Sequence, residues 1–359
     1  MKIRGWMMEQ VAAPMRLAEY AGTPGAGEVL VRVAGCGVCH TDLGFFFDGV
    51  PTRHALPLVL GHEVSGTVVE AGAGAEDWVG RDVVVPAVIP CGACPACESG
   101  RGAICPRQIF PGNDVHGGFA SHVVVPAVGL CAVPDLADPV RNPHGLSLAL
   151  LSVIADAVST PFQAIARSQL GPGDLAVFVG VGGVGGFGVQ IARARGAAVA
   201  GIDVDAARLA ALAPHGLELA LDAAALDFKQ IRAAVGGFAA ERDVATWRWR
   251  IFECSGTPAG QATAFGLLRH GAYLGVVGYT PRKVELRLSN LMALDATAQG
   301  NWGCLPAHYP AIVELVLRGD VVLGPFVETR PLATINETFH ELHAGGLGRR
   351  PVLVPESPA

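Results

Sequence analysis

The chain has 359 residues, of which 51% are hydrophobic and 16% charged, and its formal net charge is −6 at pH 7. This length is enough for two domains with buried cores, and the composition excludes an intrinsically disordered chain. The negative charge provides no basic surface, which argues against a nucleic-acid partner. A run of apolar residues around 175–189 is interrupted by glycines and is too short to span a bilayer. The first ten residues lack a signal-peptide pattern, so we expect a cytoplasmic protein.

The predicted elements change in character along the chain. From Glu28 to about Val133, short β-branched runs such as "EVLVRVAG" and "SGTVVEAG" are separated by Gly and Pro, which predicts a β-rich domain. From about Leu146, helical spacing is followed by repeated alternation of strand and helix, which predicts a doubly wound parallel sheet. After about 297 the chain is mixed and ends in the strand-like "RRPVLVP". We therefore expect a β-rich domain, an inserted α/β domain and a C-terminal return to the first domain.

The stretch 35–47, "GCGVCHTDLGFFF", places Cys36 and Cys39 two residues apart. Such a pair can be half of a zinc knuckle, a redox-active dithiol, or part of a catalytic metal site that uses one cysteine. Further on, "VLGHEVSG" places His62 and Glu63 between apolar strands, where a charged pair is costly to bury unless it binds something. A thiolate, an imidazole and one further ligand would leave a zinc position open for substrate. A hydrogen-bonded core histidine is the alternative for His62.

A second group of cysteines lies in "CGACPACESGRGAIC", with gaps of two, two and seven residues. Its members are Cys91, Cys94, Cys97 and Cys105. Four thiolates with short gaps predict a closed, structural zinc site, with an iron–sulfur cluster as the rival interpretation. The odd total of nine cysteines also favours metal ligands or buried thiols over disulfides. Cys131, Cys254 and Cys304 stand alone, and we expect them to be buried apolar residues.

The segment "VFVGVGGVGGFG" contains a G-x-G-x-x-G pattern between a predicted strand and a predicted helix. A second strand then ends in Asp203, which completes the dinucleotide-binding fingerprint. The aspartate would bind an adenosine ribose and repel a 2′-phosphate, which favours NAD over NADP, and Asp205 is the competing acid. The helix N-terminus would receive the phosphates. The cofactor-binding residues expected here are Gly180, Gly182, Gly183, Val184, Gly185 and Asp203.

"CGVCHTD", "GHEVSGTVVEAG", the four-cysteine lobe and the glycine turn occur in the order found in the zinc-dependent medium-chain alcohol dehydrogenases. The chain resembles this family over essentially its whole length. The resemblance implies a GroES-like β-rich catalytic domain and a Rossmann domain, with the active-site cleft between them. The implied domains are 1–157 (catalytic, with the structural zinc lobe at about 90–106), 158–296 (NAD-binding) and 297–359 (return to the catalytic domain).

The resemblance also implies a ligand set for a catalytic zinc. It makes Cys39 a ligand, leaves the other cysteine of the pair aside, and makes His62 the second ligand. The third ligand position, often a cysteine in the family, is occupied here by Asp156, a harder donor than a thiolate. Glu63 is expected beside the metal and able to approach it. Asp42 resembles the carboxylate that orients the ligating histidine.

The family's mechanism implies that zinc binds the substrate oxygen while hydride passes between the substrate carbon and nicotinamide. Thr41 matches the hydroxyl that hydrogen-bonds the reacting oxygen and passes its proton on. His40 and Arg350 match contacts of the coenzyme pyrophosphate. Many members carry a histidine three residues after the threonine or serine, but this chain has Gly44 there. We therefore expect the proton to leave through a ribose hydroxyl and water.

A large apolar substrate cleft is expected, with core packing as the alternative role for its aromatic residues. The pocket residues expected are Phe45, Phe46, Phe47 and Trp302. Within the family the sequence closely resembles one subgroup, the 6-hydroxycyclohex-1-ene-1-carbonyl-CoA dehydrogenases, which oxidise a ring alcohol with NAD in anaerobic benzoyl-CoA degradation. This implies an acyl-CoA thioester substrate, although no motif reports coenzyme A. The candidate side chains for its phosphates and adenine are Arg53, His54, Trp247, Arg248, Trp249 and Arg250.

Several alternatives stay open at this stage. The substrate can instead be a free cyclic or polyol secondary alcohol, and hydride can add at the alkene carbon of an enone product. A thiol–disulfide oxidoreductase would use Cys36 and Cys39 but leaves His62, Glu63 and the glycine turn unexplained. A zinc-free quinone reductase relative should lack the metal ligands, and a dinucleotide sensor should lack an open metal site. We expect an enzyme with NAD and two zinc ions per subunit, no membrane partner, and a homo-oligomer, with a tetramer favoured over a dimer.

Overall fold

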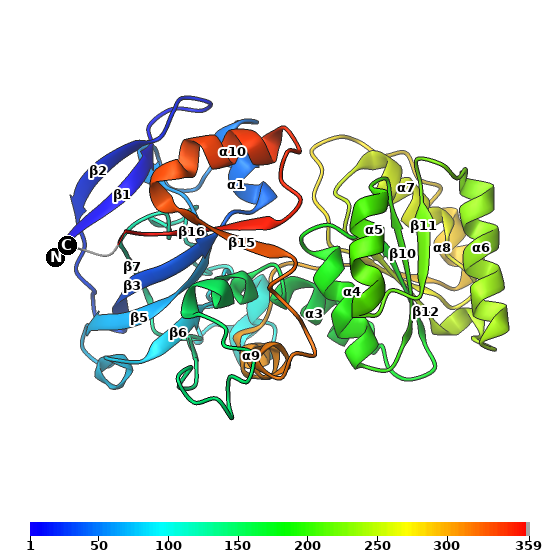
Figure 1. The fold of residues 1–359 in the computed structure, drawn as a ribbon, viewed down its shortest axis with the longest axis horizontal. Coiled ribbons are helices and arrows are strands. Elements are labelled where there is room, and N and C mark those ends of the chain that lie inside the picture. The colour runs from blue at the N-terminus through cyan, green and yellow to red at the C-terminus, as the bar shows by residue number, and fades with distance from the viewer. Residues whose placement is uncertain (357–359) are drawn as a thin grey trace. The chain divides into compact units, whose positions relative to one another are not determined.

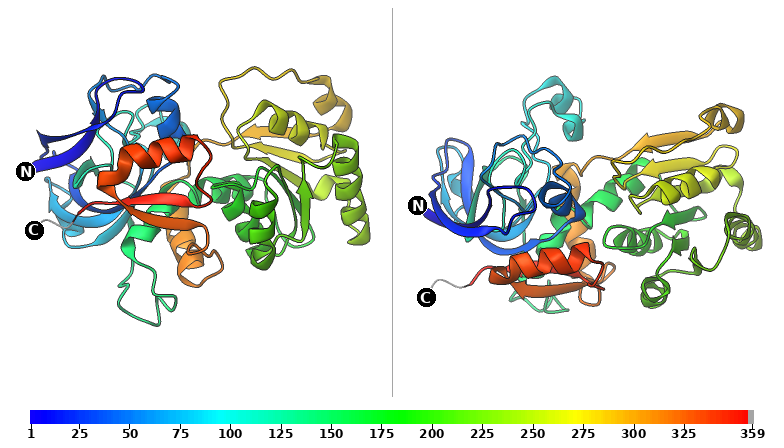
Figure 2. Two further views of the ribbon diagram at one scale, coloured as in Figure 1. Left: turned by 45° about the horizontal axis from the view of Figure 1, so that its top comes forward. Right: turned by 90° about the horizontal axis from the view of Figure 1, so that it is seen from above.

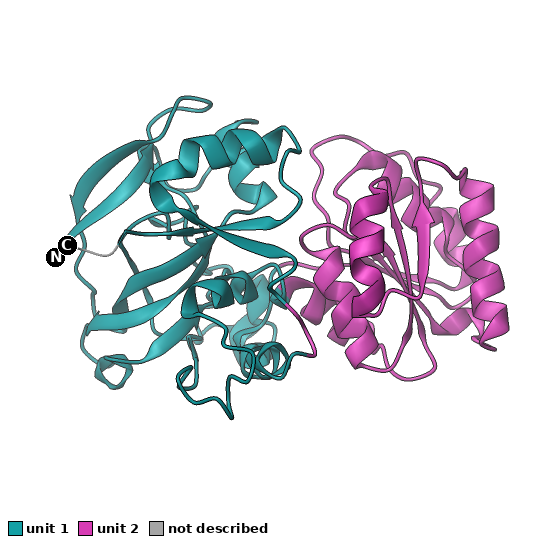
Figure 3. Ribbon diagram, in the orientation of Figure 1, with its two compact units in different colours: residues 1–159, 303–319, 323–359 teal, residues 160–302, 320–322 magenta. Residues whose placement is uncertain are grey.

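The computed structural model describes residues 1–356 and divides into two compact units (Figure 3). Unit 1 holds 1–159, 303–319 and the chain from 323 onward, and unit 2 holds 160–302 and 320–322. The chain thus stays in unit 2 for longer than the predicted boundary at 296, because the strand Thr297–Gly300 pairs with a strand of the unit 2 sheet. Among the described residues, no helix is both long and apolar enough to cross a membrane.

Unit 1 is built on two β-sheets, in agreement with the predicted β-rich domain. The smaller sheet has the order β2-β1-β4, and the larger one has the order β15-β16-β3-β5-β6-β8, with β7 also pairing β3. The pairs are antiparallel except for β15 with β16, which is parallel. The strands are β1 Lys2–Met8, β2 Arg16–Ala21, β3 Glu28–Gly37, β4 Leu58–Val59, β5 Glu63–Ala71, β6 Asp82–Val85, β7 His122–Pro126, β8 Cys131–Ala132, β15 Val327–Pro331 and β16 Arg350–Val354.

Short helices complete unit 1. The α-helices are α1 His40–Phe46, α2 Pro95–Glu98, α9 Tyr309–Leu317 and α10 Ile335–His343. The 3₁₀ helices are η1 Glu76–Trp78, η2 Gly102–Ile104, η3 Leu148–Ala155, η6 Pro306–His308 and η7 Leu332–Thr334. The C-terminal segment returns to this unit, because β16 pairs with β3 and α10 lies beside β15 and β16 (Figures 1 and 2).

The pairing of β3 with β5 sets up the site in unit 1. These strands run antiparallel, with Gly37 opposite Glu63 and Cys36 opposite Val64. The end of one strand, just before Cys39, therefore lies beside the start of the other, just after His62. Gly37 is required at this point, because a Cβ there would lie 2.0 Å from the Glu63 carboxylate. β-Branched residues on both strands are fully buried and hold this register.

Unit 2 is a Rossmann-like layer structure, which confirms the predicted fold class. Its six strands are all parallel, in the order β11-β10-β9-β12-β13-β14. The strands are β9 Leu175–Val179, β10 Ala198–Asp203, β11 Leu219–Asp222, β12 Trp249–Glu253, β13 Tyr273–Val276 and β14 Thr297–Gly300. The helices are α3 Ser159–Arg167, α4 Gly185–Ala194, α5 Ala206–Leu212, α6 Phe228–Glu241, α7 Pro258–Gly266 and α8 Ser289–Leu294, with η4 Ala213–His215 and η5 Thr246–Arg248.

The strand order of unit 2 reverses at β9, whose neighbours are β10 on one side and β12 on the other. The carboxyl end of the sheet at such a switch point is where ligands bind in open α/β folds. All five residues of β9 are buried, as expected for a central strand of a parallel sheet covered on both faces. The glycine turn follows β9 directly, and it therefore lies at the reversal.

Candidate functional site

Four side chains of unit 1 meet as a cluster of metal-ligating type. Ligand atoms of Cys39, His62, Glu63 and Asp156 all lie within 4.8 Å of one another. The Asp156 carboxylate is 3.7 Å from the Cys39 sulfur and 3.6 Å from His62 Nε2. The first three residues are buried and Asp156 is partly buried. The structure thus brings together three residues of the predicted ligand set and the acid expected beside them.

The donor chemistry of this cluster fits a divalent metal ion such as zinc, which accepts thiolate, imidazole and carboxylate ligands. The imidazole of His62 is 1% exposed, and among the described residues neither ring nitrogen has a well-aligned hydrogen bond. Burial lowers the pKa of His62, but Asp42, Asp156 and their neighbours raise it well above its ordinary value. The surroundings of this ring therefore favour positive charge, which a metal on Nε2 would supply.

Asp42 ties the segments of two predicted ligands together. It is fully buried on α1, and its carboxylate accepts hydrogen bonds from the backbone N–H of Cys39 at 2.9 Å and of Gly61 at 3.2 Å. One of its oxygens also lies 3.3 Å from His62 Nδ1. This arrangement can orient the imidazole so that Nε2 faces the other ligands.

Glu63 is held by Arg350, the first residue of β16. The guanidinium donates to both carboxylate oxygens, with 2.9 Å between Arg350 Nε and one of them. Burial raises the pKa of Glu63, and the guanidinium partly offsets that rise. Burial lowers the pKa of Arg350, but Glu63 and other anions more than reverse this. The carboxylate therefore lies near the predicted metal ligands while paired with a buried cation, and contact of Arg350 with coenzyme remains a prediction.

The residues predicted for proton transfer lie on α1. Thr41 is exposed, and its hydroxyl oxygen is 3.7 Å from the Cys39 sulfur. His40 is also exposed at the start of this helix. Gly44 lies within α1, and a Cβ added to it would contact only Val50 Cγ2, at 3.6 Å. The hydroxyl is thus close to a predicted metal ligand, Cys39, and its part in proton transfer remains a prediction.

The three phenylalanines after Gly44 do not form one wall. Phe45 and Phe46 are buried in the hydrophobic core of unit 1, and Phe46 packs edge-on against Phe47 and Phe339. Phe47 instead stacks on His343, with ring centroids 4.1 Å apart. Consecutive helical residues point in different directions, so such a run cannot line one pocket. For Phe45 and Phe46 this burial favours the packing role over the predicted pocket role, and the pocket role of Phe47 remains a prediction.

An aromatic residue that no sequence motif indicated packs against a predicted metal ligand. Phe110 stacks on the ring of His62, with centroids 4.7 Å apart and planes at 30°. Its backbone N–H donates to Asp114, which also pairs with Arg53 at 3.0 Å. No motif marks "QIFPGND" in the sequence, so only the fold could reveal this contact. Trp302, the other predicted pocket residue, ends the main segment of unit 2 with its side chain about half exposed.

The four-cysteine lobe has the geometry of a closed metal site. Its sulfur atoms are 3.4 Å apart for Cys94 with Cys97, 3.7 Å for Cys94 with Cys105, and 4.0 Å for Cys91 with Cys97. Four thiolates on one tetrahedral zinc, with bonds of about 2.3 Å, would lie roughly 3.8 Å apart. The Cys105 sulfur also accepts hydrogen bonds from backbone N–H groups, including that of Arg107 at 3.3 Å.

The five cysteines outside the lobe are all unpaired as disulfides. Cys36, Cys131 and Cys304 are buried, as expected for packing residues. Cys254 is only partly buried, which differs from the buried position predicted for it. It follows the last residue of β12, where the chain leaves the sheet and packing is less complete. Cys36 is fully buried beside the metal cluster without joining it.

The glycine turn of unit 2 has the features that a dinucleotide pyrophosphate requires. Gly180 has φ +86°, and an added Cβ would lie 2.6 Å from backbone atoms of Ser255. A Cβ on Gly185 would lie 1.9 Å from the Gly180 carbonyl oxygen, so the helix and strand pack too closely for a side chain. A Cβ on Gly182 would meet only a nitrogen of Arg208, at 3.7 Å. The backbone there is open to a ligand, next to the N-terminus of α4.

The two candidate acids after β10 have different roles. Asp203 is the last residue of that strand, and its carboxylate accepts hydrogen bonds from Val181 N at 2.8 Å and Asp205 N at 3.0 Å. Asp205 caps α5 by accepting from Ala207 N at 2.9 Å. The acid beside the glycine turn is therefore Asp203. Arg208, with its guanidinium next to Gly182, is a cation in this region that the sequence analysis missed.

The basic and aromatic residues of "TWRWR" lie at the amino ends of the strands in the unit 2 sheet, opposite to the carboxyl ends where the glycine turn lies. Trp249 begins β12 and is buried, while Arg248 pairs with Asp174 at 2.7 Å. Arg250 donates to the carbonyl of Trp247 at 2.7 Å. Strand starts in a parallel sheet face away from the edge that binds a dinucleotide. These side chains thus lie at the amino ends of the parallel strands. The glycine turn lies at the opposite, carboxyl ends.

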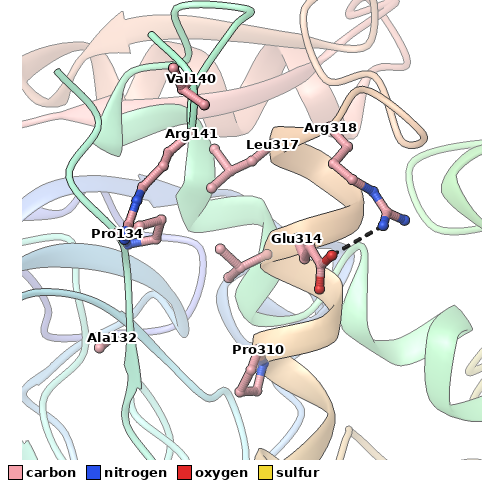
Figure 4. Close-up of a pocket in the computed structure, with 9 residues that line it drawn as sticks. Ala132, Pro134, Val140, Arg141, Pro310, Glu314, Leu317 and Arg318 are labelled. Carbon is pink, nitrogen blue, oxygen red and sulfur yellow. Dashed lines mark hydrogen bonds and ion pairs between the residues drawn. The ribbon is translucent and has the colours of Figure 1, made fainter. Parts of the chain in front are cut away.

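A hollow of about 350 Å³ in unit 1 is separate from the metal cluster (Figure 4). It lies between the 132–141 segment and the outer face of α9, where Arg318 pairs with Glu314 at 3.1 Å. Its lining residues are Ala132, Pro134, Val140, Arg141, Pro310, Val313, Glu314, Leu317 and Arg318. None of them belongs to the predicted site.

Comparison with known proteins adds independent findings. Residues 25–135 match the alcohol dehydrogenase GroES-like domain, and residues 183–318 match the zinc-binding dehydrogenase domain. The chain is 31% identical over 330 residues to an alcohol dehydrogenase of Geobacillus stearothermophilus, covering 91% of each chain. It is 29% identical over 320 residues to L-galactonate-5-dehydrogenase of Escherichia coli, covering 88% of each. The crystal structure of galactitol-1-phosphate dehydrogenase from Escherichia coli has the same fold, with a TM-score of 0.86, 22% identity, and coverage of 98% of this chain and 100% of that one.

Proposed function

This chain belongs to the zinc-dependent medium-chain alcohol dehydrogenase family, and we propose that it oxidises an alicyclic secondary alcohol to a ketone with NAD. It is an oxidoreductase of that family, and zinc and a nicotinamide dinucleotide are its cofactors. The observation that carries the proposal is the buried cluster of Cys39, His62 and Asp156, with one carboxylate where many members have a second thiolate. Three protein ligands leave one tetrahedral position for substrate.

Each residue of the site has a distinct task in this proposal. Cys39, His62 and Asp156 would hold the catalytic zinc, and the four-cysteine lobe would hold a second, structural zinc. A zinc ion held there would supply a Lewis acid for the substrate oxygen, and NAD would supply the hydride acceptor. The Thr41 hydroxyl, 3.7 Å from the Cys39 sulfur, would accept the proton of the substrate alcohol while donating its own to a ribose hydroxyl of the coenzyme. Because Gly44 offers no base, the ribose hydroxyl would in turn give its proton to water.

NAD is proposed over NADP because of Asp203. Its carboxylate closes the turn after β9 through the Val181 N–H, 2.8 Å away, and the residue is only 8% exposed. A 2′-phosphate brought next to this buried negative charge would be repelled, whereas ribose hydroxyls can donate hydrogen bonds to it. The Arg208 guanidinium lies next to Gly182 in the same turn region and can offset part of that repulsion. It also pairs with Asp205 at 3.3 Å.

For the substrate we propose a ring alcohol carried as a coenzyme A thioester, 6-hydroxycyclohex-1-ene-1-carbonyl-CoA, with the 6-oxo enone as product. The support is the overall sequence resemblance and the exposed Arg53 and His54 near Phe110. The "TWRWR" side chains lend no support, since they lie at the amino edge of their sheet. A free secondary alcohol or polyol is the second candidate, favoured by the relative that acts on L-galactonate.

Three experiments test these proposals. Asp156→Ala should lose one metal ion per subunit and most of the alcohol oxidation activity while the lobe keeps its ion. Unchanged metal content in this variant would contradict the ligand set. NAD reduction measured with cyclic alcohols, their CoA thioesters and polyols, each with and without a chelator, then identifies the substrate class. The carbon that gains deuterium from labelled NADH distinguishes carbonyl reduction from conjugate addition to the enone.

We also propose that the protein forms a homo-oligomer in the cytoplasm, with a tetramer favoured over a dimer. The supporting observation is the edge strand β14, whose four residues are all exposed. Next to it in sequence, Leu288 and Met292 of the α8 region are 68% and 78% exposed. An exposed strand edge with large apolar neighbours is normally covered, and a two-fold copy of the same edge is the simplest cover.

A further inference from the structure

A buried tyrosine outside every predicted motif reaches the backbone next to the third metal ligand. Tyr309, the first residue of α9, is fully buried. Its hydroxyl donates a hydrogen bond to the Ala155 carbonyl, with 2.5 Å between the two oxygen atoms. Ala155 is the last residue of η3, and the next residue is Asp156. The contact therefore joins the C-terminal part of unit 1 to the segment that presents a proposed zinc ligand.

The Ala155 carbonyl is held from several sides. Besides Tyr309, the Ser159 hydroxyl lies 3.0 Å away and the Ala87 N–H lies 3.3 Å away. Carbonyl groups at the end of a helix lack partners within the helix and must find them elsewhere. Ser159 has a single proton and also lies 3.3 Å from the Tyr309 oxygen, so it can serve only one of its two neighbours at a time. Tyr309 is thus the nearest of the three donors to this carbonyl.

Holding this carbonyl controls where the ligand points. The peptide group is planar, so the Ala155 carbonyl and the Asp156 N–H rotate together. Asp156 has φ −139° and ψ −57°, where the chain leaves helical geometry and its side chain turns toward Cys39 and His62. Metal–ligand distances tolerate deviations of only about 0.2 Å, so a small rotation of this peptide matters.

We propose that Tyr309 is a positioning residue for the catalytic metal, which it serves by fixing the peptide that presents Asp156. The inference rests on the proposed metal centre and adds to it a residue that touches neither metal nor substrate. Burial raises the pKa of Tyr309 well above its ordinary value, so the hydroxyl keeps its proton and remains a donor. The outer face of the same helix, with Glu314 and Arg318, borders the hollow in Figure 4 and takes no part in this contact.

The test compares two deletions of a buried tyrosine hydroxyl. Tyr309→Phe removes the donor to Ala155, whereas Tyr20→Phe removes a buried hydroxyl that has no hydrogen-bond partner among the described residues. For Tyr309→Phe we expect roughly 10-fold weaker zinc binding at the catalytic site, in the range typical of groups that orient ligands, with the lobe metal retained. With cobalt exchanged into the catalytic site, its visible absorption spectrum should also change. Tyr20→Phe should leave zinc affinity and cobalt spectrum unchanged.

Further variants separate the possible outcomes. Ser159→Ala removes a neighbouring hydroxyl and should shift the cobalt spectrum in the same direction by a smaller amount, even where Tyr309→Phe folds poorly. If Tyr309→Phe and Ser159→Ala both keep the parental zinc affinity and spectrum while Asp156→Ala loses its metal, the positioning role is overturned and the metal centre stands. If Asp156→Ala keeps both metal ions, the proposed function itself fails, together with this inference.

Discussion

At the scale of single residues, the predicted metal ligands are positioned by buried charged side chains. Asp42 makes the most contacts of this kind. Its carboxylate accepts hydrogen bonds from the backbone N–H groups of Cys39 and Gly61, and it lies close to the ring of His62. The side chain is fully buried, so bulk solvent does not compete for these hydrogen bonds. Removing its charge should therefore disturb two ligands at once, unlike removal of a charge at the surface.

Asp42→Asn tests this directly. An amide cannot accept on both of its polar atoms, and it withdraws the negative charge that faces His62, so we expect roughly 10- to 100-fold weaker binding of the catalytic metal. Metal per subunit after dialysis against increasing chelator measures this, with the lobe metal as an internal reference. Asp48→Asn, an exposed neighbour on the same segment, is the matched control. Equal metal retention in both variants would show that Asp42 does not orient His62.

Gly44 allows a second test at this scale. A Cβ is accommodated there, because it would contact only Val50, at 3.6 Å. In Gly44→His, an imidazole with a pKa of about 6.5 would be a neutral base above that pH and a cation below it. We expect alcohol oxidation to rise severalfold above about pH 6.5 and to change little below it. A pH–rate profile that matches the parent would mean that proton exit at this position does not limit turnover.

At the scale of elements, the turn between β9 and α4 separates two roles of glycine. Gly185→Ala would place a Cβ 1.9 Å from the Gly180 carbonyl oxygen, so we expect a loss of stability of several kcal/mol through overpacking and backbone shift. Gly182→Ala meets only a flexible guanidinium and should fold normally but weaken NAD binding, because the methyl occupies the space for the pyrophosphate. Thermal unfolding and NAD titration separate the two effects. Equal melting temperatures for both variants would contradict this division.

The four-cysteine lobe is a second element with a testable role. It contains only the short helices α2 and η2, and its sulfur atoms supply the contacts that close it. Cys94→Ser should lose the lobe metal and open the loop, so that trypsin cleaves after Arg101 or Arg107 while the catalytic metal stays bound. Cys131→Ser, at a buried cysteine outside the lobe, is the control. A protease-resistant Cys94→Ser protein with one metal ion would show that the lobe folds without its metal.

The elements also show what sequence alone can supply. Cys39, His62 and the glycine turn stand in spaced motifs, because their chemistry requires fixed residues at fixed positions in one segment. Phe110 and Tyr309 could not be predicted in this way, since each acts on a residue far away in the chain; Tyr309 lies 154 positions from Ala155. The sequence predicts that the run of three phenylalanines lines a pocket, because composition does not show which way each side chain points. In the helix, the side chain of Phe46 points into the core.

At the scale of the whole molecule, the predicted zinc ligands and the predicted dinucleotide-binding turn belong to different units. The proposed zinc ligands all lie in unit 1, and the glycine turn with Asp203 lies in unit 2. The chain first leaves unit 1 just after Ser159 and returns to it just after Trp302, with a brief second excursion at 320–322. Asp156 lies shortly before the first of these crossings and Tyr309 shortly after the second, so the hydrogen bond from Tyr309 to Ala155 joins these two segments within unit 1.

The proposed assembly of subunits gives the last prediction. Strand β14 is the edge of its sheet, and α8 exposes Met292 beside it, at 78%. A two-fold partner would bury this methionine against its own copy, so Met292→Glu would place two like charges face to face in an apolar contact. We expect light scattering after size exclusion to show a smaller particle at micromolar concentration, with both metal ions retained. Val140→Glu adds the same charge at an apolar residue of unit 1 that is 86% exposed, and it should leave the mass unchanged. If Met292→Glu keeps the parental mass, the subunits do not associate through this edge.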